Sequence, residues 1–177
     1  HHGAVDFIAI GRALYAITFR HKLEGGSTLT QQLVKSSLLT PERTITRKVK
    51  EVVLSFVTEI MYPKDKILEM YLNQVPYGGT AYGVEAAAQT YFGKHVEDLT
   101  LAQEAYLAAL PQAPSTYSPY GSHPELGMSR QKEVLRQMVQ QGYITAKERD
   151  TAMKEKITFQ KTINISAFKE YIKMWAS

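Results

Sequence analysis

Apolar residues recur at steps of three and four along much of the chain, which is the spacing of an amphipathic α-helix. The longest such pattern lies between positions 44 and 60, with apolar residues Ile45, Val49, Val52, Val53, Phe56 and Ile60. With a turn of about 100° per residue, the polar residues fall on the other side: Thr44, Arg47, Lys48, Glu51, Ser55 and Thr58. We therefore predict a helix whose apolar stripe is buried and whose polar, cationic face has Glu51 at its middle.

A glycine pair at positions 25 and 26 precedes a shorter predicted helix. The pair leaves the backbone free to approach a ligand closely, and Ser27 or Thr28 can then cap the helix. The N–H groups exposed at such a helix start attract anions. This helix is expected to end before Pro41. Thr40 and Pro41 predict the start of the longer helix, because proline's missing N–H is harmless at the first helical position.

The rest of the chain predicts further short helices joined by turns. They cover residues 67–73, 84–91, 101–110, 128–141 and a last segment that follows Thr145. Thr100 with Gln103, and Thr145 with Glu148, have the spacing of capping boxes, and Gly142 is placed to end the helix before it. From position 157 the apolar residues alternate, which suggests a strand. The pattern as a whole predicts a mainly α fold.

The composition fits one globular domain with an anionic partner. The chain has 177 residues, of which 44% are hydrophobic, and a formal net charge of +4 at pH 7. This length suffices for one domain with its own core, and the positive charge fits an anionic ligand or a membrane surface. The absence of cysteine excludes disulfides and cysteine metal sites. No run of about 18 apolar residues is present, so no transmembrane span is predicted within the chain.

Positive charge is concentrated between positions 35 and 50. The cluster consists of Lys35, Arg43, Arg47, Lys48 and Lys50. Arg47 and Glu51 are four positions apart and would by themselves be a solvated ion pair worth about 0.3–0.5 kcal/mol. The five cations have too few carboxylates nearby to be explained by pairing. A phosphate-bearing ligand would supply the missing negative charge.

Three motifs follow one another in the chain: GGSTLTQQLVK, RTITRKVKE and ILEMYLNQVPYGGTAYGVEAAAQTYFGK. In this order and spacing they resemble the peptidoglycan glycosyltransferase domain, family 51 of the glycosyltransferases, found in class A penicillin-binding proteins and monofunctional transglycosylases. The resemblance implies a lysozyme-like, two-lobed helical fold with an extended substrate groove. It also implies an inverting transglycosylase that polymerises lipid II into β-1,4-linked glycan strands and releases undecaprenyl pyrophosphate.

The resemblance assigns roles to individual positions. Glu51 matches the family's second catalytic glutamate, and the first one, the general base, would fall before His1. Tyr91 matches a position that lines the pyrophosphate pocket, although an aromatic residue fits a core position equally well. The departing pyrophosphate needs positive charge and hydrogen-bond donors. The residues expected to supply them are Lys35, Arg43, Arg47, Lys48, Ser27, Thr28 and Gln32.

The resemblance also bears on domains, partners and location. Residues 1–156 match the glycosyltransferase domain, truncated at its N-terminus, and residues 157–177 match the start of a linker towards a transpeptidase domain. The expected partners are lipid II, the growing glycan strand, the membrane surface and moenomycin-type inhibitors, with no nucleic acid. The expected location is the extracytoplasmic face of the bacterial cytoplasmic membrane, with an anchoring helix upstream of this chain.

Neither a cofactor nor a metal is required by this interpretation. His95 and His123 have no partner at metal-ligand spacing, so no zinc site is predicted. A divalent cation, Mg²⁺ or Mn²⁺, is compatible with Glu51, though no carboxylate cluster demands one.

Two other functions fit parts of the pattern. A lysozyme-like glycan-cleaving enzyme can use this fold with a single glutamate acid, but cleavage has no need of five cations and would release sugars from finished peptidoglycan. A non-catalytic helical module could bind anionic lipid head groups through the basic face. Such a module would not need the glycine pair, Gln32 or Glu51, so its binding would survive Glu51→Gln and Gln32→Ala.

Overall fold

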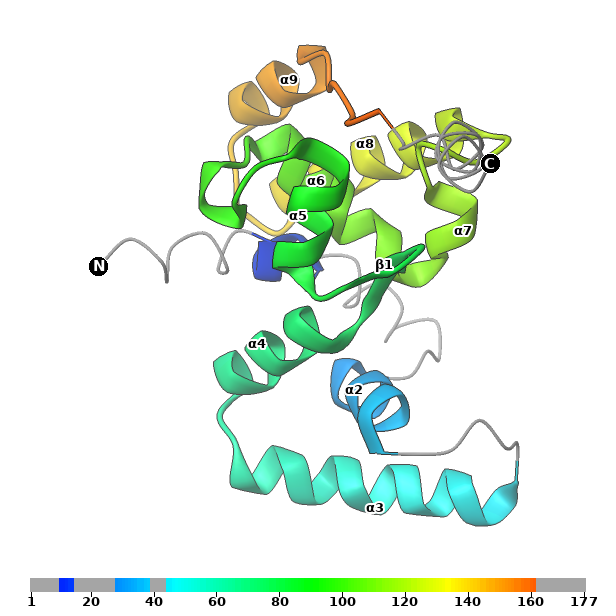
Figure 1. Ribbon diagram of the computed structural model, residues 1–177. Coiled ribbons are helices and arrows are strands. Elements are labelled where there is room, and N and C mark those ends of the chain that lie inside the picture. The colour runs from blue at the N-terminus through cyan, green and yellow to red at the C-terminus, as the bar shows by residue number, and fades with distance from the viewer. Residues whose placement is uncertain (1–9, 15–27, 39–43, 162–177) are drawn as a thin grey trace, which may run out of the picture.

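The computed structural model describes residues 10–14, 28–38 and 44–161, and within them the chain is mainly α-helical. Figure 1 shows two lobes. The lower lobe contains α2 (Leu29–Leu38), α3 (Ile45–Met61) and α4 (Lys64–Gln74). The upper lobe contains α5 (Val84–Phe92), α6 (Leu101–Ala109), α7 (Pro114–Tyr117), α8 (Pro124–Gln140) and α9 (Ala146–Lys154), with 3₁₀ turns at Val96–Asp98 and Leu110–Gln112. The predicted mainly α, two-lobed fold is confirmed.

A short antiparallel hairpin lies between the lobes (Figure 1). Strand β1 (Pro76–Gly78) follows α4 and pairs with β2 (Ala81–Tyr82). Gly83, at the return into α5, has a φ of 82°, and a Cβ there would lie 2.8 Å from the carbonyl oxygen of Asn73. Glycine is therefore required at this position, because any side chain would be strained and would clash. The hairpin lies tightly against the end of α4.

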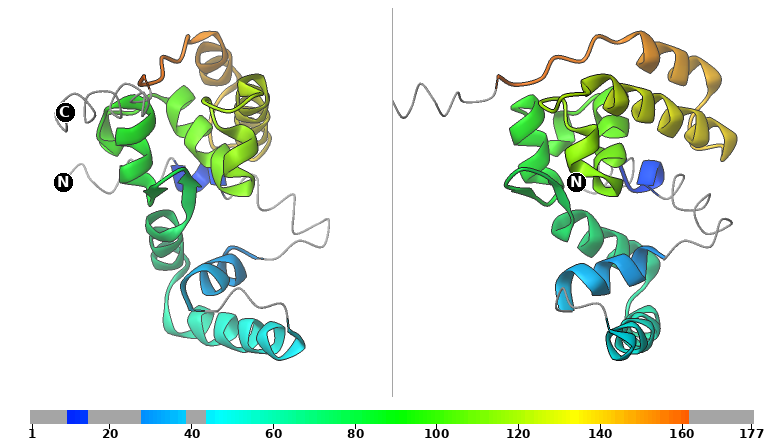
Figure 2. Two further views of the ribbon diagram at one scale, coloured as in Figure 1. Left: turned by 45° about the vertical axis from the view of Figure 1, so that its right-hand side comes forward. Right: turned by 90° about the vertical axis from the view of Figure 1, so that its right-hand side faces the viewer.

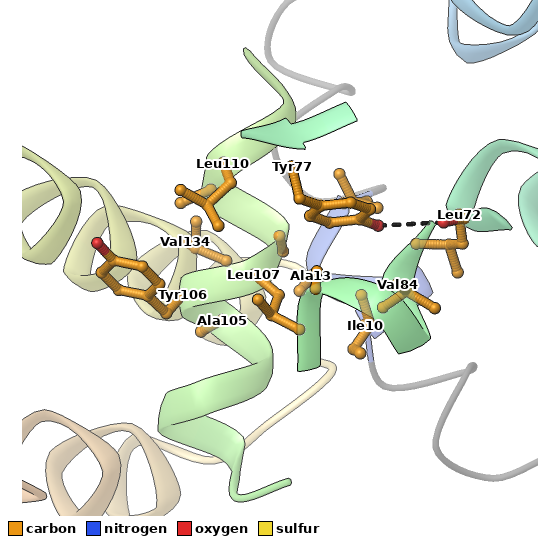
Figure 3. Packing of buried hydrophobic residues seen from close by; sticks show 14 of the residues in the cluster. Ile10, Ala13, Leu72, Tyr77, Val84, Ala105, Tyr106, Leu107, Leu110 and Val134 are labelled. Carbon is orange, nitrogen blue, oxygen red and sulfur yellow. Dashed lines mark hydrogen bonds between the residues drawn. The ribbon is translucent and has the colours of Figure 1, made fainter. Parts of the chain in front are cut away.

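Helix α6 forms the centre of the upper lobe. All residues from 102 to 110 are buried, and the alanines among them allow close approach of neighbouring helices. Figure 3 shows Leu107 and Leu110 beside Val134 of α8. Ile10 and Ala13, in the helical stretch at 10–14, belong to the same buried cluster. The N-terminal stretch therefore completes a core formed mainly by α4 to α8.

Helix α8 lies in close contact with α6 and α7 at Gly127. A Cβ at this position would clash with the carbonyl oxygen of Tyr117 and would lie 2.5 Å from Tyr106 Oη. The Tyr106 hydroxyl donates a hydrogen bond to the same Tyr117 oxygen at 2.7 Å. Buried Gln131, one turn further along α8, donates from Nε2 to the carbonyl oxygen of Ala102 at 3.0 Å. Close backbone approach and buried hydrogen bonds together hold these helices in one arrangement.

Several predicted helix ends are confirmed. Thr100 and Thr145 both form complete capping boxes, with Gln103 and Glu148 as their partners. Gly142 follows the end of α8 with a φ of 75°, the left-handed conformation that glycine adopts at helix ends. These ends were predictable because caps depend on residues only three positions apart.

The predicted start of α3 is wrong. The helix begins at Ile45, with Thr44 as its N-cap in an extended conformation whose side chain accepts a hydrogen bond from the Arg47 N–H. Thr40 and Pro41 lie outside the described residues. Two threonines lie close together here, and the one nearer to the apolar pattern provides the cap.

The strand suggested from position 157 is also wrong for the residues that are described. Residues 156–161 are irregular. Phe159 packs its ring on Phe92 at 5.6 Å and against Tyr106 at 4.9 Å, while the Gln160 N–H donates to the carbonyl oxygen of Tyr91 at 2.8 Å. The alternating side chains therefore pack onto α5 and α6 without a partner strand. The boundary after residue 156 stays a prediction.

Helix α3 faces the opposite way from the prediction. Glu51 and Ser55, on its polar face, are buried, whereas Ile45, Phe56 and Ile60 are 87%, 66% and 70% exposed. Figures 1 and 2 show α3 at the outer end of the lower lobe, with α2 and α4 on one side of it. The periodicity separates the two faces correctly. It cannot tell which of them meets the rest of the protein.

Replacing Gly127 by alanine tests the close packing in the upper lobe. In an exposed helix, glycine to alanine stabilises by about 1 kcal/mol. Here we expect Gly127→Ala to destabilise by about 1–3 kcal/mol, because the new methyl group overpacks the contact. Urea unfolding measures the change. Ser129→Ala, at an exposed position of α8, is the control and should change stability by less than about 0.5 kcal/mol. A more stable Gly127→Ala protein would contradict this packing.

Candidate functional site

Three predicted ligand-binding residues share one face of α2. Thr28 caps the helix, because its Oγ1 accepts a hydrogen bond from the Gln31 N–H at 3.2 Å. Gln32 and Lys35 follow at four and seven positions from Thr28, which places all three on the same side, and both are exposed. The helix start therefore presents a hydroxyl, an amide and an ammonium group together. Ser27, the alternative cap, lies outside the described residues.

Gln32 is held by the neighbouring helix. Tyr71 of α4 donates a hydrogen bond from its hydroxyl to Gln32 Oε1 at 3.0 Å. The Tyr71 side chain is buried, and this burial raises its pKa to about 12. The hydroxyl therefore keeps its proton at neutral pH. From sequence, Tyr71 is identified only as an inward-facing helix residue, since nothing in the spacing indicates a partner 39 positions away.

The second part of the site is the inward face of α3. Glu51 is 2% exposed, and its Oε1 lies 2.6 Å from Lys48 Nζ, with the Lys48 side chain 55% exposed. The carbonyl oxygen of Glu51 accepts a hydrogen bond from Ser55 Oγ at 2.6 Å. Arg47 is half-buried and lies on the same side of the helix. A buried carboxylate is thus linked to a cation that reaches the surface.

The structure brings most of the described candidates together in the lower lobe. Helix α2 packs against α3, so the α2 residues and the Lys48–Glu51 pair belong to adjacent helices (Figure 1). Arg43 lies outside the described residues.

Tyr91 lies elsewhere, in the core of the upper lobe. It is 2% exposed, its hydroxyl donates to the carbonyl oxygen of Tyr77 at 2.7 Å, and its ring stacks on Tyr120 at 5.8 Å. These contacts are those of the core alternative considered for this residue. Its place in a pyrophosphate pocket stays a prediction.

The described part of the chain contains no group of three or more metal-ligating side chains. Glu51 could hold a divalent cation only together with groups from the ligand or solvent. The two histidines considered for metal binding each lie beside a carboxylate, His95 beside Glu85 at 2.7 Å and His123 beside Glu125 at 3.1 Å. Nor does any helix within residues 10–14, 28–38 or 44–161 have the length and apolar character to cross a membrane.

One solved structure with a similar fold is a 2.6 Å crystal structure of penicillin-binding protein 1A from Haemophilus influenzae. It aligns with a TM-score of 0.53 and 33% sequence identity, over 82% of this chain and 19% of that one. The likeness confirms the predicted lysozyme-like fold class.

Sequence comparison gives the same family. Penicillin-binding protein 1A of Aquifex aeolicus (strain VF5) is 47% identical over 97% of this chain and 23% of its own length. Penicillin-binding protein 1F of Bacillus subtilis (strain 168) is 51% identical over 86% of this chain and 21% of its own length. The chain thus spans about a quarter or less of the length of these relatives. The family model for the transglycosylase domain matches residues 1–139, and this chain belongs to the transglycosylase family.

Proposed function

We propose that the chain is a peptidoglycan glycosyltransferase that polymerises lipid II into β-1,4-linked glycan strands and releases undecaprenyl pyrophosphate. The observation that carries the proposal is the buried Glu51, paired with Lys48 on a helix that packs against α2. A diphosphate ester fits this arrangement, because the ammonium groups of Lys35 and Lys48 can stabilise its negative charge. The family membership supports the same reaction.

The proposed transfer inverts the anomeric centre. The 4-hydroxyl of the acceptor sugar attacks the anomeric carbon of the donor, a C–O bond forms there, and the bond to the diphosphate oxygen breaks. A general base takes the hydroxyl proton, and the family resemblance places that base before His1. Negative charge collects on the leaving diphosphate, where fixed cations stabilise it most strongly. Lys35, Arg47 and Lys48 are the described residues proposed for this role.

Glu51 is proposed to order the cations and not to donate a proton. Its carboxylate is almost fully buried and already accepts a hydrogen bond from the Lys48 ammonium group. A pair of this kind fixes the ammonium group in position before the ligand arrives, so that little reorganisation is needed during the reaction. If Mg²⁺ or Mn²⁺ takes part, Glu51 would be its protein ligand and the ion would supply further positive charge for the leaving diphosphate. The same pairing disfavours the glycan-cleaving alternative, which needs a protonated glutamate.

The outward face of α3 is proposed to lie in the outer leaflet of the cytoplasmic membrane, where lipid II resides. Its exposed apolar residues are Ile45, Val49, Val52, Val53, Phe56, Val57, Ile60 and Met61. A continuous stripe along a helix about 25 Å long is typical of an interfacial helix. By helical rotation, Lys48 lies beyond one edge of the stripe and Lys50 lies near the other edge, between Val57 and Met61, where anionic head groups would meet them. Lipid contact alone would also suit a binding module, so the activity tests below separate the two functions.

Glu51→Gln tests the catalytic role of the buried carboxylate. In a protein extended upstream through the family's first glutamate, polymerisation of labelled lipid II should fall by about 10²-fold or more, because Lys48 loses its charged partner. Glu59→Gln, at an exposed carboxylate of the same helix, should keep normal activity. Circular dichroism verifies that both proteins are folded. Normal glycan synthesis by Glu51→Gln would count against the proposed role.

Lys35→Ala tests the diphosphate site. We expect affinity for moenomycin, measured by fluorescence polarisation, to fall about tenfold or more, since a hydrogen bond between charged groups is lost. Lys132→Ala, which removes an exposed cation from α8 in the upper lobe, is the matched control. Equal affinities for the two variants would place the phosphates away from α2.

Phe56→Ser tests membrane contact. Binding to vesicles of phosphatidylglycerol and phosphatidylethanolamine should weaken about tenfold, because an inserted aromatic side chain is removed. Tyr82→Ser is the control, since Tyr82 has the same 66% exposure but lies on the hairpin. Sedimentation with vesicles measures both. If the two substitutions weakened binding equally, α3 would not be the inserted element.

A further inference from the structure

The contact between Tyr71 and Gln32 joins a buried donor to an exposed amide. Tyr71 is 3% exposed, and Gln32 lies on the surface of α2. Among the described residues, Gln32 Oε1 is the acceptor for this hydroxyl, at 3.0 Å. An inward NH₂ group could donate to the tyrosine oxygen, but the hydroxyl proton would then have no acceptor. A buried donor without an acceptor is costly, so the tyrosine favours the orientation that brings an oxygen towards it.

This preference has a chemical consequence at the surface. A glutamine amide carries one accepting oxygen and an NH₂ group with two donors, and it can present either end. When Oε1 is turned inward to Tyr71, the NH₂ group is turned to the exposed side. The Lys35 ammonium group on the same face is also a pure donor. The surface then offers amide and ammonium donors to a ligand, with the Thr28 hydroxyl at the helix start already accepting from a backbone N–H.

We propose that Tyr71 is a positioning residue that fixes the Gln32 amide with its NH₂ group towards the substrate, so that this face of α2 accepts phosphate or sugar oxygens and rejects donors. The inference rests on the proposed function, because it requires Gln32 to contact the substrate. Tyr71 itself does not touch the substrate. It acts by removing one of two amide orientations before binding.

A second buried tyrosine provides a matched comparison. The Tyr77 hydroxyl points to the carbonyl oxygen of Leu72 at a longer distance of 3.4 Å (Figure 3). Tyr77 is fully buried, and burial raises the pKa of its hydroxyl as well. Loss of either hydroxyl leaves the ring packing intact. Of these two hydroxyls, only that of Tyr71 bonds to a side chain proposed to contact the ligand, because the Tyr77 hydroxyl bonds to a backbone carbonyl.

The test measures lipid II polymerisation by the full-length enzyme carrying Tyr71→Phe. KM should rise about three- to tenfold with kcat largely kept, since an unfixed side chain must be immobilised on binding. Tyr77→Phe should leave KM unchanged. The melting temperature reports any structural effect separately, and a purely structural role for Tyr71 would lower it without a selective change in KM.

A double-mutant cycle with Gln32→Ala decides whether Tyr71 acts through Gln32. Gln32→Ala should raise KM tenfold or more, and Tyr71→Phe should have no further effect in that background. Additive effects would overturn the positioning role. If Gln32→Ala changed KM but Tyr71→Phe did not, the positioning role would be wrong and the proposed function would stand. If Gln32→Ala left KM unchanged, the assignment of Gln32 as a substrate contact would fail, and the positioning role with it.

Gln32→Glu gives a test that does not depend on altering the buried tyrosine. One carboxylate oxygen can still accept from Tyr71, but the other replaces the NH₂ group with a negative acceptor. KM should therefore rise more than in Gln32→Ala. If Gln32→Glu left KM for lipid II unchanged, the NH₂ group would not face the ligand.

Discussion

The ion pair between Lys48 and Glu51 lies on the face of α3 that is turned towards the rest of the protein, and the apolar face is turned outward. Glu51 is 2% exposed, and its carboxylate lies 2.6 Å from the Lys48 ammonium group. Burying an ionised carboxylate costs several kcal/mol even when it is paired. Turning Phe56 and its apolar neighbours outward forgoes about 1.5–3 kcal/mol for each large side chain. Both features lower the stability of the isolated chain. The proposed function explains them together, because a charged ligand would meet one face of α3 and lipid would cover the other.

The two lobes contribute differently to this arrangement. The upper lobe is close-packed around α6, and the contact at Gly127 leaves no room even for a methyl group. In the lower lobe, the candidate ligand-binding side chains Gln32, Lys35 and Lys48 are exposed, and so is the apolar face of α3. Helix α4 belongs to both, because Leu72 is buried in the shared core while Tyr71, one residue earlier, holds Gln32 on α2. Helix α4 is therefore anchored in the packed core and holds a candidate ligand-binding side chain of α2 in place.

Local sequence patterns predicted the ends marked by Thr100, Thr145 and Gly142 and the two faces of α3, because caps and amphipathic faces depend on residues within one or two turns. They placed the start of α3 at the wrong threonine. These patterns could not predict which face of α3 is turned towards the rest of the protein. An apolar stripe is usually buried in a protein core, and no single-chain pattern distinguishes that from a stripe exposed at the surface of the molecule, as it is on α3. The Tyr71–Gln32 contact could not be predicted from local patterns either, since it joins residues 39 positions apart. The alternation near Phe159 suggested a strand, but its rings pack on Phe92 and Tyr106.

The most direct test of the account is a crystal structure of the full-length enzyme with a diphosphate-bearing sugar lipid or its phosphoglycolipid mimic. The account predicts phosphate oxygens within hydrogen-bond distance of Lys35 and Lys48, with Glu51 still paired to Lys48 and Phe56 among the detergent or lipid chains. Phosphates bound to the upper lobe, with Lys48 and Gln32 facing only solvent, would contradict it.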